Sequence, residues 1–125
     1  MASTIKKPWG REVLYARGPG YAGKIITVEK GRRLSLQYHV RKHETIYVLQ
    51  GRFVLRLGGR ERVLAAGASA VIPPRTVHRF DARFGRVVLL EASTPELTDV
   101  VRLEDDYGRA TKAPARRTDA SRRKK

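Results

Sequence analysis

Apolar and polar residues alternate along much of the chain, in short runs that glycine and proline interrupt. In the segment 52–57, RFVLRL, the alternation places Phe53, Leu55 and Leu57 on one face of an extended chain and the arginines on the other. This pattern is typical of a sheet that contacts a core on one side and solvent on the other. No segment has the apolar period of a long helix. The chain is therefore predicted to be all-β.

Turn residues set the ends of the predicted strands. Gly58 and Gly59 give the strongest hairpin signal, and Pro73 ends a strand because its nitrogen has no hydrogen to donate to a sheet. Trp9 is expected to anchor the entry segment 7–11 against the body of the domain. The predicted strands are 13–15, 24–29, 45–50, 52–57, 60–64, 70–72, 78–81 and 86–92.

Two of these strands differ from the others in their apolar content. The segment 45–50 is apolar on both faces and is predicted to be buried, and 86–92 is predicted to be a central strand with Glu91 at its end. The form of the polar closing segment 100–109 stays open. About eight short strands at close spacing favour a sandwich or barrel over an arrangement with helical crossovers.

Length and composition limit the chain to one folded domain. With 125 residues, of which 41% are hydrophobic, the chain is long enough for one core and too short for two of ordinary size. We expect a domain over 1–109 and a disordered tail over 110–125, which is rich in charged and small residues and lacks apolar periodicity. No apolar run is long enough for a secretion signal or a membrane span, so a cytoplasmic protein without membrane contact is expected.

Part of the positive charge of the chain is concentrated in the predicted tail. The net charge is +15, and residues 110–125 contribute +6 of it through seven lysines and arginines and one aspartate. We interpret this tail as a solubilising extension. Contact of the tail with nucleic acid or another anionic surface is the less favoured alternative.

Residues suited to binding a metal converge in the segment 31–51. Gln37 and His39 are two residues apart and point to the same face of a strand, and Glu44 follows after a short polar link. His78 is available to complete the site. The chain has no cysteine, so a metal must be held by nitrogen and oxygen atoms. Two imidazoles and a carboxylate suit Zn, Fe, Mn, Ni or Cu.

The spacing of these residues resembles the two motifs of the cupin superfamily. The first is Gly-x5-Gln-x-His-x4-Glu-x6-Gly over residues 31–51, and the second is Gly-x5-Pro-x4-His over residues 67–78. Within this superfamily the chain resembles the carboxy-terminal domain of type II phosphomannose isomerases, through PWG at 8–10, LSLQYH at 34–39, IPPRTVHR at 72–79 and VVRLEDDYGR at 100–109. The resemblance implies a jelly-roll β-barrel of two sheets around a metal-binding interior. Arg75 stands where this family usually has glycine.

The resemblance also implies roles for individual residues. Gln37, His39, Glu44 and His78 match the metal ligands of the family, for which zinc is the usual metal and iron, manganese, nickel or cobalt are alternatives. In addition, two basic residues match positions of phosphate recognition or catalysis, and these are Lys24 and Arg109. The planar guanidinium of an arginine suits bidentate binding of a phosphate.

The activity implied by the resemblance is the interconversion of mannose 6-phosphate and fructose 6-phosphate. A metal would stabilise an enediolate while a base moves a proton between C1 and C2. Glu91, Lys24 and His43 are candidates for this base, and Glu91 is preferred because it ends a strand that is expected to line the barrel, where burial raises the pKa of a carboxylate.

Other functions and assemblies remain open. The larger relatives carry a guanylyltransferase domain, but this chain lacks their glycine-rich nucleotide loop, so nucleotidyl transfer is not implied. One alternative is a dioxygenase that uses two histidines and a carboxylate, and another is a sugar-binding or regulatory cupin without turnover. A homodimer formed by pairing of sheets is expected.

Overall fold

The computed structural model describes residues 2–111, and these form eleven β-strands without a helix. The all-β prediction is confirmed. In chain order the strands are β1 Ser3–Lys7, β2 Gly10–Gly18, β3 Tyr21–Val28, β4 Leu36–Tyr38, β5 Glu44–Gln50, β6 Arg52–Leu57, β7 Arg60–Ala65, β8 Ser69–Ile72, β9 His78–Asp81, β10 Val87–Ser93 and β11 Val101–Glu104. No helix in this part of the chain is long and apolar enough to cross a membrane.

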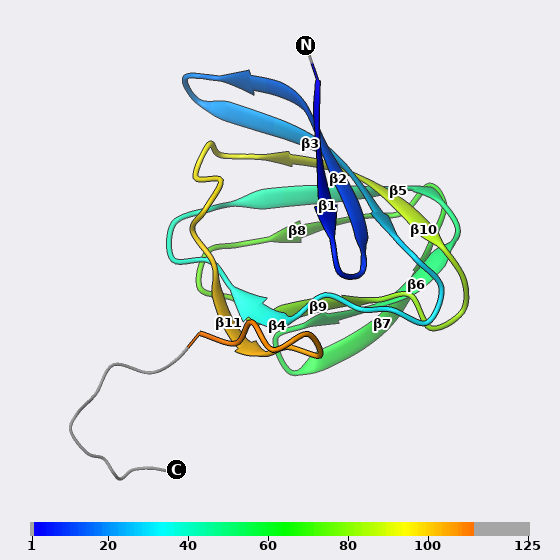
Figure 1. The fold of residues 1–125 in the computed structure, drawn as a ribbon. Helices are drawn as coiled ribbons and strands as arrows, with labels where there is room; N and C mark the ends of the chain where they lie inside the picture. Colours follow the sequence, from blue (N-terminus) through cyan, green and yellow to red (C-terminus); the bar gives the residue numbers. More distant parts are fainter. Residues whose placement is uncertain (1, 112–125) are drawn as a thin grey trace, which may run out of the picture.

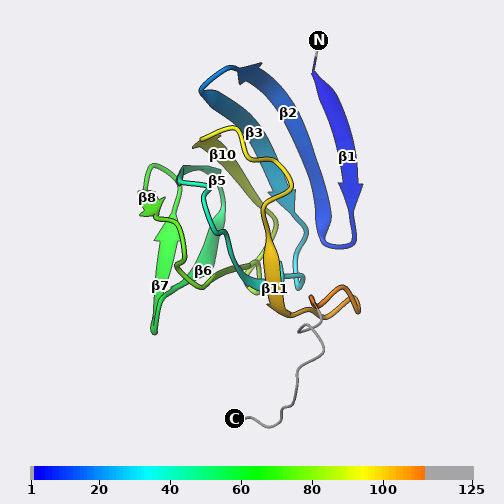
Figure 2. The same ribbon diagram turned by 90° about the vertical axis from the view of Figure 1, so that its left-hand side faces the viewer.

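The strands form two antiparallel sheets that face each other (Figures 1 and 2). A six-stranded sheet has the order β1-β2-β3-β10-β5-β8, and a five-stranded sheet has the order β11-β4-β9-β6-β7. The apolar core lies between them: Ile26 and Leu89 come from one sheet, and Phe53 and Phe80 from the other. The two phenylalanine rings meet edge to face with their centroids 5.7 Å apart. This is the expected jelly-roll arrangement.

All eight predicted strands occur in the structure, and the segment whose form was left open contains β11. One strand was missed, and one burial prediction is wrong. Strand β1 was not predicted because Ile5 is its only apolar residue and the strand lies at a sheet edge. The segment 45–50 is not buried on both faces: Ile46 is fully buried, whereas Tyr47 is 44% exposed. The outer face of the six-stranded sheet is open in the single chain, so its apolar residues contact solvent. The expected homodimer would cover such residues and stays a prediction.

Backbone geometry explains two features of the motifs. A side chain at Gly10 would place its Cβ 1.9 Å from the carbonyl oxygen of Thr27, so only glycine fits after Trp9. Arg75 has a φ of 60°, a left-handed conformation that glycine adopts at lower cost, which is consistent with the glycine usual at this position in the family. Trp9 is 2% exposed and belongs to the core, so its predicted role as an anchor is confirmed.

The first two residues of the predicted tail, 110 and 111, belong to the described part of the chain. The backbone N–H of Thr111 donates to the carbonyl oxygen of Arg102, and the Thr111 hydroxyl accepts a hydrogen bond from the Arg102 N–H. Hydrogen bonds to β11 are therefore made by a residue that was assigned to the tail. The rest of the segment for which disorder was predicted, 112–125, lies outside the described residues.

The inward face of β3, β5, β9 and β10 changes from apolar to charged or polar toward one end of the sandwich. On β10, for example, Val87 and Leu89 lie in the core and Glu91 follows them at the same period of two. The same change occurs from Ile26 to Lys24 on β3, from Ile46 to Glu44 on β5 and from Phe80 to His78 on β9. Strand periodicity and antiparallel pairing thus gather the polar side chains at one end of the interior.

Candidate metal centre and central cavity

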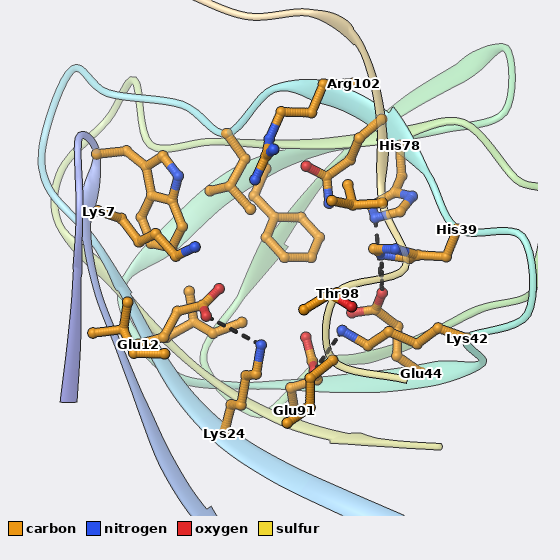
Figure 3. Close-up of a pocket in the computed structure, with 18 of the residues that line it drawn as sticks. Lys7, Glu12, Lys24, His39, Lys42, Glu44, His78, Glu91, Thr98 and Arg102 are labelled. Carbon is orange, nitrogen blue, oxygen red and sulfur yellow. Dashed lines mark hydrogen bonds and ion pairs between the residues drawn. The ribbon is translucent and has the colours of Figure 1, made fainter. Parts of the chain in front are cut away.

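A cavity of about 330 Å³ lies at this end of the interior, and we call it the central cavity. Its volume is in the range of small-molecule sites, about 300–1,000 Å³. Figure 3 shows two groups of polar side chains in it. His39, Glu44 and His78 form a group on one side, whereas Lys7 and Arg102 lie away from this group.

The three residues His39, Glu44 and His78 form a compact group of potential metal ligands. Nε2 of His39 lies 2.9 Å from Oε2 of Glu44, and Nε2 of His78 lies 3.8 Å from the same oxygen. One ligand atom from each residue lies within 4.8 Å of the other two. All three side chains are buried. The structure thus brings together three of the four predicted ligands in a geometry that one cation could bridge.

Backbone carbonyls orient both imidazole rings. Nδ1 of His39 lies 2.5 Å from the carbonyl oxygen of Asp99, and Nδ1 of His78 lies 2.9 Å from that of Thr76. A carbonyl oxygen only accepts hydrogen bonds, so each Nδ1 carries a hydrogen and donates it. In the neutral rings, each Nε2 therefore directs a lone pair at Glu44, which is the arrangement that metal-binding histidines usually have.

The charge state of these groups fits a bound cation. Burial lowers the pKa of His78, which favours its neutral form. Burial alone would raise the pKa of Glu44, but a hydrogen bond from His39, formed when its Nε2 carries a proton, and the positive charge of Lys42 hold that pKa well below its usual value. Oε2 of Glu44 is buried and accepts no hydrogen bond from the described residues. Two nitrogen lone pairs and an ionised oxygen converge, and a divalent metal would satisfy all three.

Gln37, the fourth predicted ligand, also lines the central cavity. It pairs with His78 across β4 and β9, so the two residues lie side by side. Its Oε1 accepts a hydrogen bond of 2.6 Å from the Ser35 hydroxyl. A carbonyl oxygen has a second lone pair, so this contact is compatible with a metal bond. The role of Gln37 as a ligand stays a prediction.

Asp99 holds the turn that carries one of the histidines. Its carboxylate accepts hydrogen bonds from the backbone N–H groups of Val40, Arg41 and Lys42, at 3.0, 2.7 and 3.0 Å. Its own carbonyl oxygen accepts the hydrogen of His39 Nδ1. Burial would raise the pKa of Asp99, but the three N–H groups lower it. Asp99 therefore fixes the position of the turn and the orientation of the His39 ring together.

Replacing Asp99 by alanine is expected to weaken metal binding by about 10-fold to 100-fold, because loss of a residue that orients a ligand typically has this effect. Competition with a chelator measures the affinity. Asp106→Ala is the matched control, since Asp106 is paired at the surface with Arg33 and its side chain is 41% exposed. Equal metal affinities of the wild type and Asp99→Ala would contradict this positioning role.

Lys42 is a buried residue of the cavity that the sequence analysis missed. It is 5% exposed, and its Nζ lies 3.0 Å from Oε2 of Glu91. Burial and the charge of Glu44 raise the pKa of Glu91 to about 7, against the opposing effect of Lys42. Lys42 lies in the turn before β5, two residues ahead of Glu44, so strand periodicity gives no direct signal for it.

The predicted basic residues Lys24 and Arg109 line the cavity, but both have acidic partners. Nζ of Lys24 lies 3.1 Å from Glu12, and it is buried rather than extended to solvent. Nε and Nη2 of Arg109 donate to the two carboxylate oxygens of Asp105 at 2.9 and 3.0 Å. These two hydrogen bonds occupy the guanidinium nitrogens that were expected to bind a phosphate. His43, the other candidate base, is exposed and lies outside the cavity.

Comparisons with known sequences identify relatives of this chain. It is 32% identical over 114 residues to mannose-1-phosphate guanylyltransferase ManC of Salmonella typhimurium, and the match covers 87% of this chain and 24% of that protein. It is 34% identical over 116 residues to the alginate biosynthesis protein AlgA of Pseudomonas aeruginosa, and the match covers 89% of this chain and 24% of that protein. The matched part is the C-terminal cupin region of these proteins, so the chain spans about a quarter of their length.

Solved structures and a family model agree on the fold. KdgF from Halomonas sp. has a TM-score of 0.70 at 23% identity, covering 75% of this chain and 88% of that protein. An RmlC-like cupin from Shewanella frigidimarina has a TM-score of 0.71 at 21% identity, covering 78% and 86%. The family model described as the cupin domain matches residues 24–92, which is more than half of the chain. On this sequence match and this fold, the chain belongs to the cupin family.

Proposed function

We propose that this chain is a metal-dependent isomerase that interconverts mannose 6-phosphate and fructose 6-phosphate, with zinc as the metal. The observation that carries the proposal is the placement of a buried carboxylate, Glu91, in the same cavity as His39, Glu44 and His78. Aldose–ketose isomerisation requires a base beside a centre that polarises a carbonyl group. Similarity to the cupin region of enzymes named for mannose 1-phosphate supports a phosphosugar as the substrate.

In this proposal the residues of the chain divide the work of the reaction. A metal bound by His39, Glu44 and His78 would act as a Lewis acid toward the oxygens of the open-chain sugar. Glu91 takes a proton from one of the two carbons C1 and C2 and returns it to the other. Its pKa of about 7 suits both steps, because an acid–base group works best when its pKa is near the working pH. Lys42 holds the Glu91 carboxylate in place at 3.0 Å.

The apolar walls of the cavity assist this chemistry. Ile26, Phe80, Leu97 and Val100 line it together with the charged residues. A sugar that fills the cavity displaces water from these walls. Electrostatic interactions between the substrate and the charged groups become stronger where water is excluded.

A coupled assay of the zinc-loaded chain tests the proposed function. We expect conversion of mannose 6-phosphate to fructose 6-phosphate, loss of this turnover on chelation, and recovery when zinc is added back. A fully metallated sample that does not convert mannose 6-phosphate would refute the proposal. In that case, oxygen uptake by an iron-loaded sample would indicate a dioxygenase, and thermal stabilisation by sugar without turnover would indicate a binding protein.

A further inference from the structure

The side of the central cavity away from the metal ligands contains two cationic residues without acidic partners. Lys7 and Arg102 have no ion pair within residues 2–111, and Nε of Arg102 is buried without a hydrogen-bond acceptor. A buried donor without a partner is costly and rare in proteins. Figure 3 shows both side chains directed into the cavity. The two residues therefore present N–H donors to whatever occupies this space.

The neighbouring acidic residues are already engaged. Glu12 pairs with Lys24 at 3.1 Å, and Asp105 pairs with Arg109 at 2.9 Å. These two pairs leave the charges of Lys7 and Arg102 uncompensated. This side of the cavity therefore carries an excess of about two positive charges, which is the complement of a phosphate monoester dianion.

The pKa shifts of Lys7 and Arg102 agree with this excess of positive charge. Burial lowers the pKa of Lys7, and the positive charges of Lys24, Arg102 and Arg109 lower it further against the effect of Glu12. Burial also lowers the pKa of Arg102, with repulsion from Arg109 as the next cause. The folded chain holds like charges together in a partly dry site, and a bound anion would relieve this repulsion.

The fold brings these residues together from distant parts of the chain. Lys7 ends β1, an edge strand of the six-stranded sheet, and Arg102 lies on β11, an edge strand of the five-stranded sheet. Both line the same cavity as His78. A ligand that fills the cavity therefore meets the metal ligands with one part and the two cations with another.

We propose that Lys7 and Arg102 form the subsite that binds the phosphate group of the substrate. This inference rests on the proposed function, and it replaces Lys24 and Arg109 as the main phosphate contacts because both of those residues are held in ion pairs. The guanidinium of Arg102 offers the planar donors that suit a phosphate, and Lys7 adds a second charge.

Isothermal titration of the zinc-loaded chain with inorganic phosphate, mannose 6-phosphate and mannose tests this subsite. We expect Arg102→Gln and Lys7→Met each to weaken binding of both phosphate-containing ligands by about 10-fold to 100-fold, the usual effect of losing a charge-assisted hydrogen bond. Binding of mannose should not change. The hydrogen bonds between Arg102 and Thr111 involve the Arg102 backbone, so the Arg102→Gln side chain leaves them intact.

Two controls separate this subsite from other binding of phosphate. Arg86→Gln removes an arginine that is paired with Glu29 on the surface, and it should bind phosphate like the wild type. Repeating the phosphate titration with His78→Ala, which disrupts the metal ligands, removes binding of phosphate to zinc itself. If Arg102→Gln lowers the affinity for inorganic phosphate in the His78→Ala background as well, the result supports the subsite.

The outcomes for the subsite and for the isomerase proposal are distinct. If both Arg102→Gln and Lys7→Met bind inorganic phosphate and mannose 6-phosphate as the wild type does, the subsite is refuted, even if the chain is an isomerase. If the variants lose phosphate affinity but the wild type shows no turnover, the subsite stands and the isomerase proposal falls.

Discussion

His78→Ala is expected to lose the metal. Its metal affinity should fall by more than the roughly 10-fold to 100-fold that is typical when a residue hydrogen-bonded to a ligand is lost. The variant removes one of two imidazoles and leaves His39, Glu44 and the predicted ligand Gln37 to hold the ion. The side chains of His39 and Glu44 are buried, and a single imidazole with a carboxylate binds a divalent ion less tightly than the complete set. Metal content per chain after dialysis, measured by plasma mass spectrometry, gives the result.

Two controls make this prediction specific. His43→Ala changes a histidine in the same segment as His39, but its side chain is exposed and lies outside the cavity, so full metal content is expected. Circular dichroism of His78→Ala should retain the β spectrum, because the apolar core lies toward the other end of the sandwich. Unchanged metal content in a folded His78→Ala would show that the assigned site is wrong.

Residues of the site that lie on strands were accessible to sequence reasoning. Side chains alternate with period two, so one correctly placed residue fixes the face of its neighbours. This is why Gln37 and His39 were predicted to lie together and why Glu91 was expected to face the interior. Lys42 lies in the turn before β5 and not on the strand, so this rule does not reach it, and the sequence analysis did not consider it.

Other parts of the site depend on contacts that carry no local signal. Asp99 acts through backbone N–H groups about sixty residues earlier in the chain, and a backbone donor has no signature in a sequence. Lys7 lies on a mostly polar edge strand, whose position is set by pairing with β2 rather than by its own periodicity. The Glu12 partner of Lys24 likewise follows from strand pairing, whereas Asp105 is only four residues from Arg109, so that ion pair was open to sequence reasoning. Both ion pairs are the reason why the proposed phosphate contacts are Lys7 and Arg102.

Glu91 contacts a buried lysine, and it is also the proposed base of the isomerisation. It lies 3.0 Å from Lys42, so it compensates a buried positive charge, and it lies in the cavity where a base for the isomerisation is needed. Removing Glu91 alone leaves Lys42 without its partner, which is itself destabilising because a buried charge is then unpaired. The two roles therefore require a pair of variants, one with and one without the lysine charge.

Glu91→Gln is expected to lower kcat for mannose 6-phosphate by about 100-fold to 10,000-fold, the usual contribution of a general base, with little change in KM or metal content. If Glu91 only compensates Lys42, the double variant Lys42→Met, Glu91→Gln should regain activity because both charges are gone. If Glu91 is the base, the double variant stays inactive. Glu29→Gln, at an exposed ion pair with Arg86, serves as the control. A kcat of Glu91→Gln within a few-fold of the wild type would rule out Glu91 as the base.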